Sequence, residues 1–259
     1  MRCALLQSQS VSRLLEVMLA DQLQNRVAWV TGGSAGIGYA IAQSLVEAGY
    51  LVVISARNEE GLRAACADLG KSGGTVDHVV MDVSRRSDVE QACRCILDRH
   101  GRIDVLVNNA GFNVKARKWE DLVPEEFDAV IAANLSGTFY AIHSVLPSMR
   151  ANGGGTVVNL ASMAGKQVSL DGGVAYTAAK HGVFVMSQLL NQSELKHGIR
   201  TCIVAPAGVD TRAHAWRPRE VRDMMLKPED VARAVRFAVE TPPHVAIFEI
   251  DICAVPRRA

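Results

Sequence analysis

A glycine-rich turn between an apolar strand and a helix most restricts the folds open to this chain. Residues 26–31 read RVAWVT, a run typical of a buried parallel strand, and residues 39–50 follow a helical pattern. Gly32, Gly36 and Gly38 lie between them. Because glycine has no side chain and a helix N-terminus offers free N–H groups, such a turn can hold a diphosphate. The turn therefore predicts a βαβ unit that binds a dinucleotide.

The same alternation of strand and helix continues along the whole chain. Helical patterns separate the apolar runs, and no repeat, linker or low-complexity stretch interrupts them. We therefore expect an α/β fold in which one doubly wound parallel sheet forms a single domain over residues 23–259. The strands expected after the first one span residues 51–55, 75–83, 103–111, 153–162, 198–206 and 244–252.

The composition is that of a globular protein. Hydrophobic residues make up 49% of the 259 residues, charged residues 21%, and the net charge is +1. Without a basic tail or an acidic run, neither nucleic acid nor a membrane surface is expected as a partner. No apolar run approaches the roughly 20 residues of a transmembrane helix. Six cysteines without metal-binding spacing predict no metal site and indicate a reducing compartment.

Residues 1–22 precede the first expected strand and contain one amphipathic run, VSRLLEVMLA. This N-terminal extension lacks the long apolar core of a secretory signal. A short helix or a disordered extension is the favoured interpretation, and a mitochondrial transit peptide is the alternative. We therefore expect a cytoplasmic protein and leave mitochondrial targeting open.

The end of the second expected strand indicates which dinucleotide binds. No acid stands at the end of this strand, and Arg57 follows it. An acid there accepts the ribose hydroxyls of NAD, whereas a guanidinium suits the 2′-phosphate of NADP. The alternative is that Arg57 is a solvated loop charge close to Glu59 and Glu60. The absence of an acid at this strand end and the presence of Arg57 together favour NADP(H) over NAD(H).

Polar residues also end the third and fourth expected strands. Asp82 either accepts a hydrogen bond from the adenine amino group or caps the helix that begins near Ser84. Asn108 and Asn109 close a strongly apolar strand just before Gly111. Adjacent amides can satisfy neighbouring backbone groups while the glycine leaves room for a ligand. A simple turn is the alternative.

A tyrosine and a lysine carry the chemistry that the sequence predicts. Tyr176 and Lys180 are four residues apart and would lie on one face of a helix. An ammonium beside a phenol lowers the phenol pKa, which allows proton exchange with an alcohol or carbonyl oxygen. Ser162 ends the fifth strand, where open parallel sheets bind ligands. An ordinary surface pair is the alternative, since this spacing alone is a weak signal.

Two helical stretches, residues 124–134 and 135–150, meet at Asn134. Asparagine is unfavourable inside a helix, so we expect Asn134 to bend the helix by bonding backbone or water. Pro147 should limit or kink the second stretch.

Together these motifs resemble those of the short-chain dehydrogenases/reductases of the single-domain type. The resemblance covers about residues 23–252 and includes TGGSAGIG at 31–38, NNAG at 108–111, YTAAK at 176–180 and PAGVDT at 206–211. It implies a Rossmann fold with a seven-stranded sheet in three αβα layers. It also implies an NAD or NADP cofactor, a small alcohol or carbonyl substrate, and a homodimer or homotetramer.

The resemblance also implies roles for individual residues. Tyr176 would be the catalytic acid/base, and Lys180 would lower its pKa and hold the nicotinamide ribose. Ser162 would orient the substrate oxygen, and Asn134 would keep a water relay in place. The implied cofactor contacts are Gly32, Ser34, Gly36, Ile37, Gly38, Arg57, Asp82, Val83, Asn108, Ala110, Gly111, Tyr176, Lys180, Pro206, Val209 and Thr211.

Two stretches depart from the family pattern or extend it. Ala207 stands where the family has glycine, so Val209 and Thr211 are carried over less directly. Residues 212–226 form a basic, helix-like stretch whose arginines either clamp a carboxylate-bearing substrate or form a solvated face or an oligomer contact. These arginines are Arg212, Arg217, Arg219 and Arg222.

We therefore expect an NADP-dependent oxidoreductase that interconverts a secondary alcohol and a ketone. The chain end, PEDVA…TPPHV…EI, is similar to members that act on 3-hydroxy acids, so a 3-hydroxy acid or 3-oxo acyl substrate is suggested. One alternative is a non-catalytic nucleotide-binding sensor or scaffold. Another is an epimerase or dehydratase on nucleotide sugars, which would need a larger region after Thr211.

Overall fold

The computed structural model describes residues 26–255, so the predicted extension over residues 1–22 lies outside the described residues. Seven strands form one sheet in the order β3-β2-β1-β4-β5-β6-β7, and every neighbouring pair is parallel. This confirms the predicted Rossmann-type sheet. The strands are β1 Val27–Thr31, β2 Leu51–Ala56, β3 Val76–Val80, β4 Val105–Asn108, β5 Gly155–Leu160, β6 Ile199–Pro206 and β7 Glu249–Ile252.

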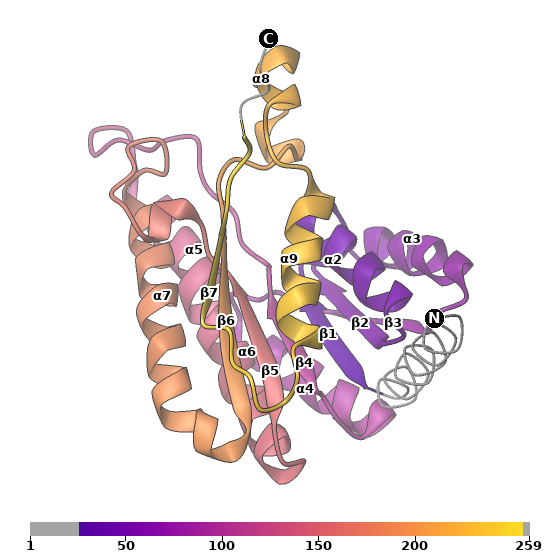
Figure 1. The fold of residues 1–259 in the computed structure, drawn as a ribbon. Helices are drawn as coiled ribbons and strands as arrows, with labels where there is room; N and C mark the ends of the chain where they lie inside the picture. Colours follow the sequence, from indigo (N-terminus) through magenta and orange to yellow (C-terminus); the bar gives the residue numbers. More distant parts are fainter. Residues whose placement is uncertain (1–25, 256–259) are drawn as a thin grey trace, which may run out of the picture.

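Helices cover both faces of this sheet and complete the three predicted layers (Figure 1). Helices α2 and α9 lie side by side on one face, and α4 and α6 pack together on the other. The helices are α2 Gly36–Glu47, α3 Glu59–Leu69, α4 Arg86–His100, α5 Pro124–Ile131, α6 Gly137–Ala151, α7 Val174–Glu194, α8 Arg219–Asp223 and α9 Pro228–Glu240.

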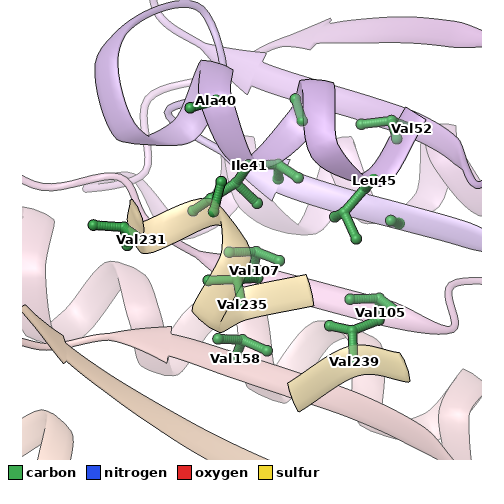
Figure 2. Close-up of a cluster of buried hydrophobic side chains, with 14 of the residues drawn as sticks. Ala40, Ile41, Leu45, Val52, Val105, Val107, Val158, Val231, Val235 and Val239 are labelled. Carbon is green, nitrogen blue, oxygen red and sulfur yellow. The ribbon is translucent and has the colours of Figure 1, made fainter. Parts of the chain in front are cut away.

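Aliphatic side chains hold the first of these faces together. Figure 2 shows Ile41 and Leu45 of α2 and Val235 of α9 above Val107 and Val158 of the sheet. All five are fully buried. Each such side chain contributes roughly 1.5–3 kcal/mol by leaving water. This packing places the N-terminus of α2 at the carboxyl edge of the sheet, next to the glycine turn.

Four strands, β3, β4, β5 and β7, are shorter than their sequence patterns predicted. β3 ends at Val80 and β4 at Asn108, so Asp82 and Gly111 lie in loops beyond the strand ends. β7 begins only at Glu249. The buried Arg200 holds the segment before β7, because its guanidinium donates to Pro242 O at 2.6 Å and to Val245 O at 2.8 Å. The same guanidinium donates to Val239 O of α9 at 3.0 Å. A side-chain contact rather than strand pairing therefore engages Val245.

The basic stretch after Thr211 is not one helix. It contains a 3₁₀ turn, η5 (Arg212–His214), and the separate short helix α8. Pro218 stands immediately before α8 and has φ −54° and ψ 149°. Proline disfavours helical geometry in the residue that precedes it, so the two turns cannot merge.

The expected bend at Asn134 is a π-helical turn. This turn, η2 (Ala132–Ser136), joins α5 to α6 into one run, and Asn134 Nδ2 donates to Val130 O at 2.9 Å. Side-chain competition for a backbone carbonyl explains the widened turn. Pro147 lies inside α6 without ending it.

The run Pro124–Ala151 also corrects the expectation that no apolar stretch is long enough to span a membrane. It has 28 residues and contains an 18-residue window with a mean hydropathy of 1.4, so it could cross a membrane by length and composition alone. However, 44% of its apolar window is buried inside the protein, where Ala141, Val145 and Met149 pack in the second core. Packing between α4 and the sheet therefore accounts for its composition.

Candidate active site

The glycine turn is closed by the polar end of β4. Asn109 Nδ2 donates to Thr31 O at 2.9 Å and to Gly32 O at 3.2 Å. The backbone N–H groups of Asn109 and Ala110 both donate to Thr31 Oγ1 at 3.0 Å. Two segments far apart in the sequence are thereby joined at the carboxyl edge of the sheet. Asn109, which sequence reasoning left out of the predicted cofactor contacts, makes the connection.

The turn itself leaves no room for side chains. Gly32 and Gly36 have φ values of +67° and +57°, in the left-handed region that favours glycine. A Cβ at Gly38 would lie 2.3 Å from Gly32 O. A Cβ at Gly36 would lie 3.7 Å from Thr211 Cγ2, so the predicted Thr211 contact faces the turn. A close-packed backbone at the N-terminus of α2 fits a diphosphate.

Four other predicted contacts border the turn and the end of β6. Ser34 is half-buried within the turn, and Ile37 packs against the first core. Pro206 ends β6, and the buried Val209 forms an isolated parallel bridge with Leu226. The segment from Pro206 to Thr211 therefore runs from the sheet to the glycine turn.

Asn108 occupies a different position from Asn109. Its side chain is buried, and Nδ2 donates to Asn159 Oδ1 at 2.8 Å. Asn159 Nδ2 donates in turn to Ser187 Oγ at 2.8 Å. The amide of Asn108 thus belongs to a buried polar chain that links β4 and β5 to α7. Its predicted cofactor contact stays a prediction.

Arg57 and Asp82 lie near each other where β2 and β3 end. Burial opposes ionisation of Asp82, but hydrogen bonds from Ser84 and the charge of Arg57 lower its pKa. Asp82 Oδ1 accepts from Ser84 Oγ at 2.7 Å and from Ser84 N at 3.0 Å. It does not cap α4, which follows Arg85, so that alternative was wrong. Val83, another predicted cofactor contact, lies close to the start of α6: a Cβ at Gly137 would be 2.6 Å from Val83 O.

Ser162, Tyr176 and Lys180 come together beyond the end of β5. Tyr176 and Lys180 lie one turn apart on α7, and Lys180 Nζ is 5.5 Å from the centroid of the Tyr176 ring. Lys180 Nζ donates to Leu160 O at 2.8 Å, which holds the lysine against β5. Ser162 follows that strand, and its side chain lies close enough to Tyr176 to lower the pKa of the phenol. The predicted trio therefore shares one location.

Burial reverses the expected direction of the Tyr176 pKa. Burial raises the pKa of Tyr176, while the nearby Ser162 hydroxyl and the charge of Arg117 act against this rise. Burial also lowers the pKa of Lys180 from 10.5 to about 8. The free-energy cost of removing the phenolate from water is larger here than the stabilisation that neighbouring groups give it. The sequence-based expectation of a lowered tyrosine pKa is therefore wrong.

The burial of Lys180 predicts how stability depends on pH. Between pH values of about 8 and 10.5, this amine binds fewer protons in the folded chain than in the unfolded one. Its contribution to the free energy of unfolding therefore rises with pH across that window. Lys180→Met lacks this titration. The free energy of unfolding of the wild type relative to that of Lys180→Met should rise by roughly 3 kcal/mol.

Urea denaturation of both proteins from about pH 7 to 10 measures this difference. In Lys180→Met, Leu160 O lacks its hydrogen-bond donor at every pH. This loss therefore does not change how the difference in the free energy of unfolding depends on pH. A difference that stays constant over the window would contradict a buried, easily deprotonated lysine.

Asn134 and Gly111 meet beside this trio. A Cβ at Gly111 would lie 2.3 Å from Asn134 Oδ1, so glycine is required there. Asn134 Nδ2 donates to Phe112 O at 2.8 Å, which ties η2 to the loop after β4. Asn134 Oδ1 is buried and accepts no hydrogen bond from residues 26–255. A buried acceptor of this kind can receive a hydrogen bond from water.

Sequence reasoning passed over Arg117, which lies in the loop after β4. Val174 N donates to Arg117 O at 3.3 Å, so this loop packs against the start of α7. The charge of Arg117 acts on both Tyr176 and His214. No local pattern singled out this arginine, because the loop has no periodicity and only the fold brings it to Tyr176.

Comparison with known proteins identifies the family. A family model described as short chain dehydrogenase matches residues 26–221. An uncharacterized oxidoreductase of Staphylococcus saprophyticus is 33% identical over 235 residues, which cover 89% of this chain and 98% of that protein. The chain belongs to the short-chain dehydrogenase/reductase family. As a member of this family, the protein is a nucleotide-binding oxidoreductase that acts on small molecules.

Solved structures of short-chain dehydrogenases/reductases share this fold. A metagenomic short-chain oxidoreductase in complex with NADP is 32% identical, with a TM-score of 0.81 over 91% of this chain and 99% of that one. An alcohol dehydrogenase from the archaeon Thermococcus sibiricus, complexed with 5-hydroxy-NADP, is 29% identical. Its TM-score is 0.81 over 90% of this chain and 98% of that chain.

Proposed function

We propose that this short-chain dehydrogenase/reductase uses NADP(H) to interconvert a secondary alcohol and a ketone, with Tyr176 as acid/base. One observation supports this proposal most. The Tyr176 side chain lies beside the buried Lys180 and near Ser162, at the carboxyl edge that also carries the glycine turn. A proton donor and its two polar neighbours thus stand where parallel sheets bind ligands.

The chain offers a consistent set of groups for the cofactor. Gly32, Gly36 and Gly38, together with the N-terminus of α2, would hold the diphosphate. Arg57 would bind the 2′-phosphate and Lys180 the nicotinamide ribose. When bound, the nicotinamide supplies or accepts the hydride.

The protein itself handles the proton. In carbonyl reduction, Tyr176 gives its phenolic proton to the carbonyl oxygen as negative charge develops there. Ser162 donates a hydrogen bond that orients the same oxygen, and the positive charge of Lys180 stabilises the phenolate left behind. The raised pKa of Tyr176 keeps the phenol protonated at neutral pH, which suits this direction. Asn134 Oδ1 would hold a water that returns the proton.

Arg57 decides the choice of cofactor in this proposal. A guanidinium–phosphate contact is charge-assisted and bidentate, so Arg57→Ala should weaken NADPH binding by roughly 10–100-fold. NADH has no 2′-phosphate, so its affinity should change by less than about threefold. Fluorescence titration gives both dissociation constants.

Arg63→Ala is a matched control for this test, since Arg63 is an exposed arginine on α3 that pairs with Glu59 at 2.6 Å. It should leave both affinities unchanged. Equal weakening of NADPH and NADH by Arg57→Ala would remove the case for NADP(H).

A turnover assay separates this function from a nucleotide-binding sensor or scaffold. NADPH oxidation is followed with ketones, 3-oxo acids and 3-oxo acyl thioesters, for the wild type and Tyr176→Phe. Turnover by the wild type that is lost in the variant supports the enzyme. A wild type that binds NADPH and converts none of these compounds would favour the sensor.

We also propose a homodimer or homotetramer, in the cytoplasm. Exposed apolar side chains on α6 and α7 support subunit contacts there: Phe139, Val185 and Leu189 are 50%, 57% and 58% exposed. Light scattering would contradict this assembly if it returned the 27.9 kDa of a single chain.

A further inference from the structure

Arg117 is held beside the predicted catalytic tyrosine by backbone groups alone. Its Nη1 donates to Asp171 O and its Nε to Val114 O, the latter at 3.3 Å. A Cβ at Gly173 would lie 2.6 Å from Arg117 Cβ, so backbone and side chain meet closely there. Gly173 immediately precedes α7, whose first turn carries Tyr176. The guanidinium is therefore fixed at the start of that helix.

Arg217 lies in the segment between η5 and α8. Its guanidinium carbon is 4.8 Å from the centroid of the Trp216 ring. Its Nε is buried and has no hydrogen-bond partner among the described residues. Burial lowers the pKa of His214, and the charges of Arg217 and Arg117 lower it further. Both guanidinium groups thus act on one imidazole, which stays neutral at physiological pH.

These two arginines differ from the other cations of the segment. Arg222 and Lys227 both pair with Asp210, at 2.6 and 2.9 Å, and Arg219 pairs with Asp223. Within residues 26–255, neither Arg117 nor Arg217 forms an ion pair with a carboxylate. A half-buried guanidinium without an anion has lost hydration, and no opposite charge offsets that loss.

We propose that the substrate carries a carboxylate, which Arg117 binds while Arg217 adds a second positive charge at the same rim. This inference rests on the proposed function, since it places the carboxylate relative to a carbonyl held by Ser162 and Tyr176. The planar fork of a guanidinium matches the two oxygens of a carboxylate. Arg117 has five N–H donors and uses two groups for backbone carbonyls, so donors remain for the substrate.

This assignment changes which arginines select the substrate. The sequence had offered Arg212, Arg217, Arg219 and Arg222 as carboxylate clamps. Ion pairs within the protein already engage Arg219 and Arg222, and Arg212 is exposed. Of those four, the structure leaves Arg217, and it adds Arg117 from a different loop.

The test compares 3-oxo, 4-oxo and 5-oxo acids with their methyl esters. Esterification removes the charge and retains the ketone. Calorimetry with saturating NADP⁺ gives binding without turnover, and NADPH oxidation gives kcat/KM. The wild type should favour the best acid over its ester by at least about tenfold, and Arg117→Gln should lower affinity and kcat/KM for that acid by roughly 100-fold. The ester should change by less than about threefold.

Three variants provide the controls. Arg117→Lys keeps the charge and should restore part of the preference for the acid, whereas Arg219→Gln should behave as the wild type. Arg217→Gln should lower the acid-to-ester ratio by about three- to tenfold. Since the ester also depends on the loop and on Tyr176, an equal loss for acid and ester in Arg117→Gln would assign Arg117 a structural role and overturn the proposal.

The outcomes also separate this inference from the proposed function. Equal or better use of esters by the wild type would overturn the carboxylate proposal while the oxidoreductase stands. Binding of an acid that depends on Arg117, without any turnover, would support the carboxylate site and refute the proposed reaction. If neither acids nor esters bind in the presence of NADP⁺, the carboxylate site is refuted.

Discussion

Tyr176→Phe should lower kcat for ketone reduction by about 10²–10⁴-fold, the range that a positioned general acid contributes. The ring stays in place, so packing on α7 and the neighbouring Lys180 are retained. Only the proton that the developing alkoxide needs is removed. The dissociation constant for NADPH should change by less than about threefold, because the phenol is proposed to act on the substrate oxygen.

Stopped-flow and steady-state NADPH oxidation, together with fluorescence titration of NADPH, measure these two quantities. Tyr140→Phe is a matched control, since Tyr140 lies on α6 and outside the site. It should retain full activity. Equal turnover by Tyr176→Phe and the wild type would contradict the assignment of Tyr176 as acid/base.

Gly38→Ala should weaken NADPH binding by at least about 100-fold and reduce stability by roughly 1–3 kcal/mol. The added Cβ would lie 2.3 Å from Gly32 O and 2.4 Å from Asn109 Nδ2. Both groups belong to the contact that joins β1 to the end of β4. The turn must therefore open, and the N–H groups at the start of α2 lose their common direction.

Gly70→Ala separates this effect from a general cost of replacing glycine. Gly70 has φ −68°, and a Cβ there meets no atom within 4 Å. NADPH titration and urea denaturation of both variants measure binding and stability. Gly70→Ala should leave NADPH binding unchanged. If Gly38→Ala also bound NADPH normally, the glycine turn would not be the diphosphate site.

Much of the fold could be predicted because its signals are local. The apolar runs of β1 and β2 and the helical periods between them depend on neighbouring residues only. Gly32 and Gly36 need left-handed φ values, and glycine meets this need at small steric cost. The spacing of Tyr176 and Lys180 places them on one helical face in any context.

Other features depended on atoms that are distant in the sequence. The segment before β7 is held by the guanidinium of Arg200 on β6, which donates to Pro242 O and Val245 O. Asn108 and Asn109 look alike in the sequence, but Asn108 is the last residue of β4 and Asn109 is the first residue after it. The side chain of Asn108 donates a hydrogen bond to the buried Asn159, whereas the side chain of Asn109 donates to Gly32 O in the glycine turn.

By itself, the sequence determined the order of elements, the glycine turn and the shared face of Tyr176 and Lys180, since these follow from periodicity and backbone sterics. Only the tertiary structure decided the direction of the Tyr176 pKa and the presence of Arg117 beside it. Both depend on burial and on charges brought together from separate loops. Desolvation is a property of the folded interior, which no local pattern of residues specifies.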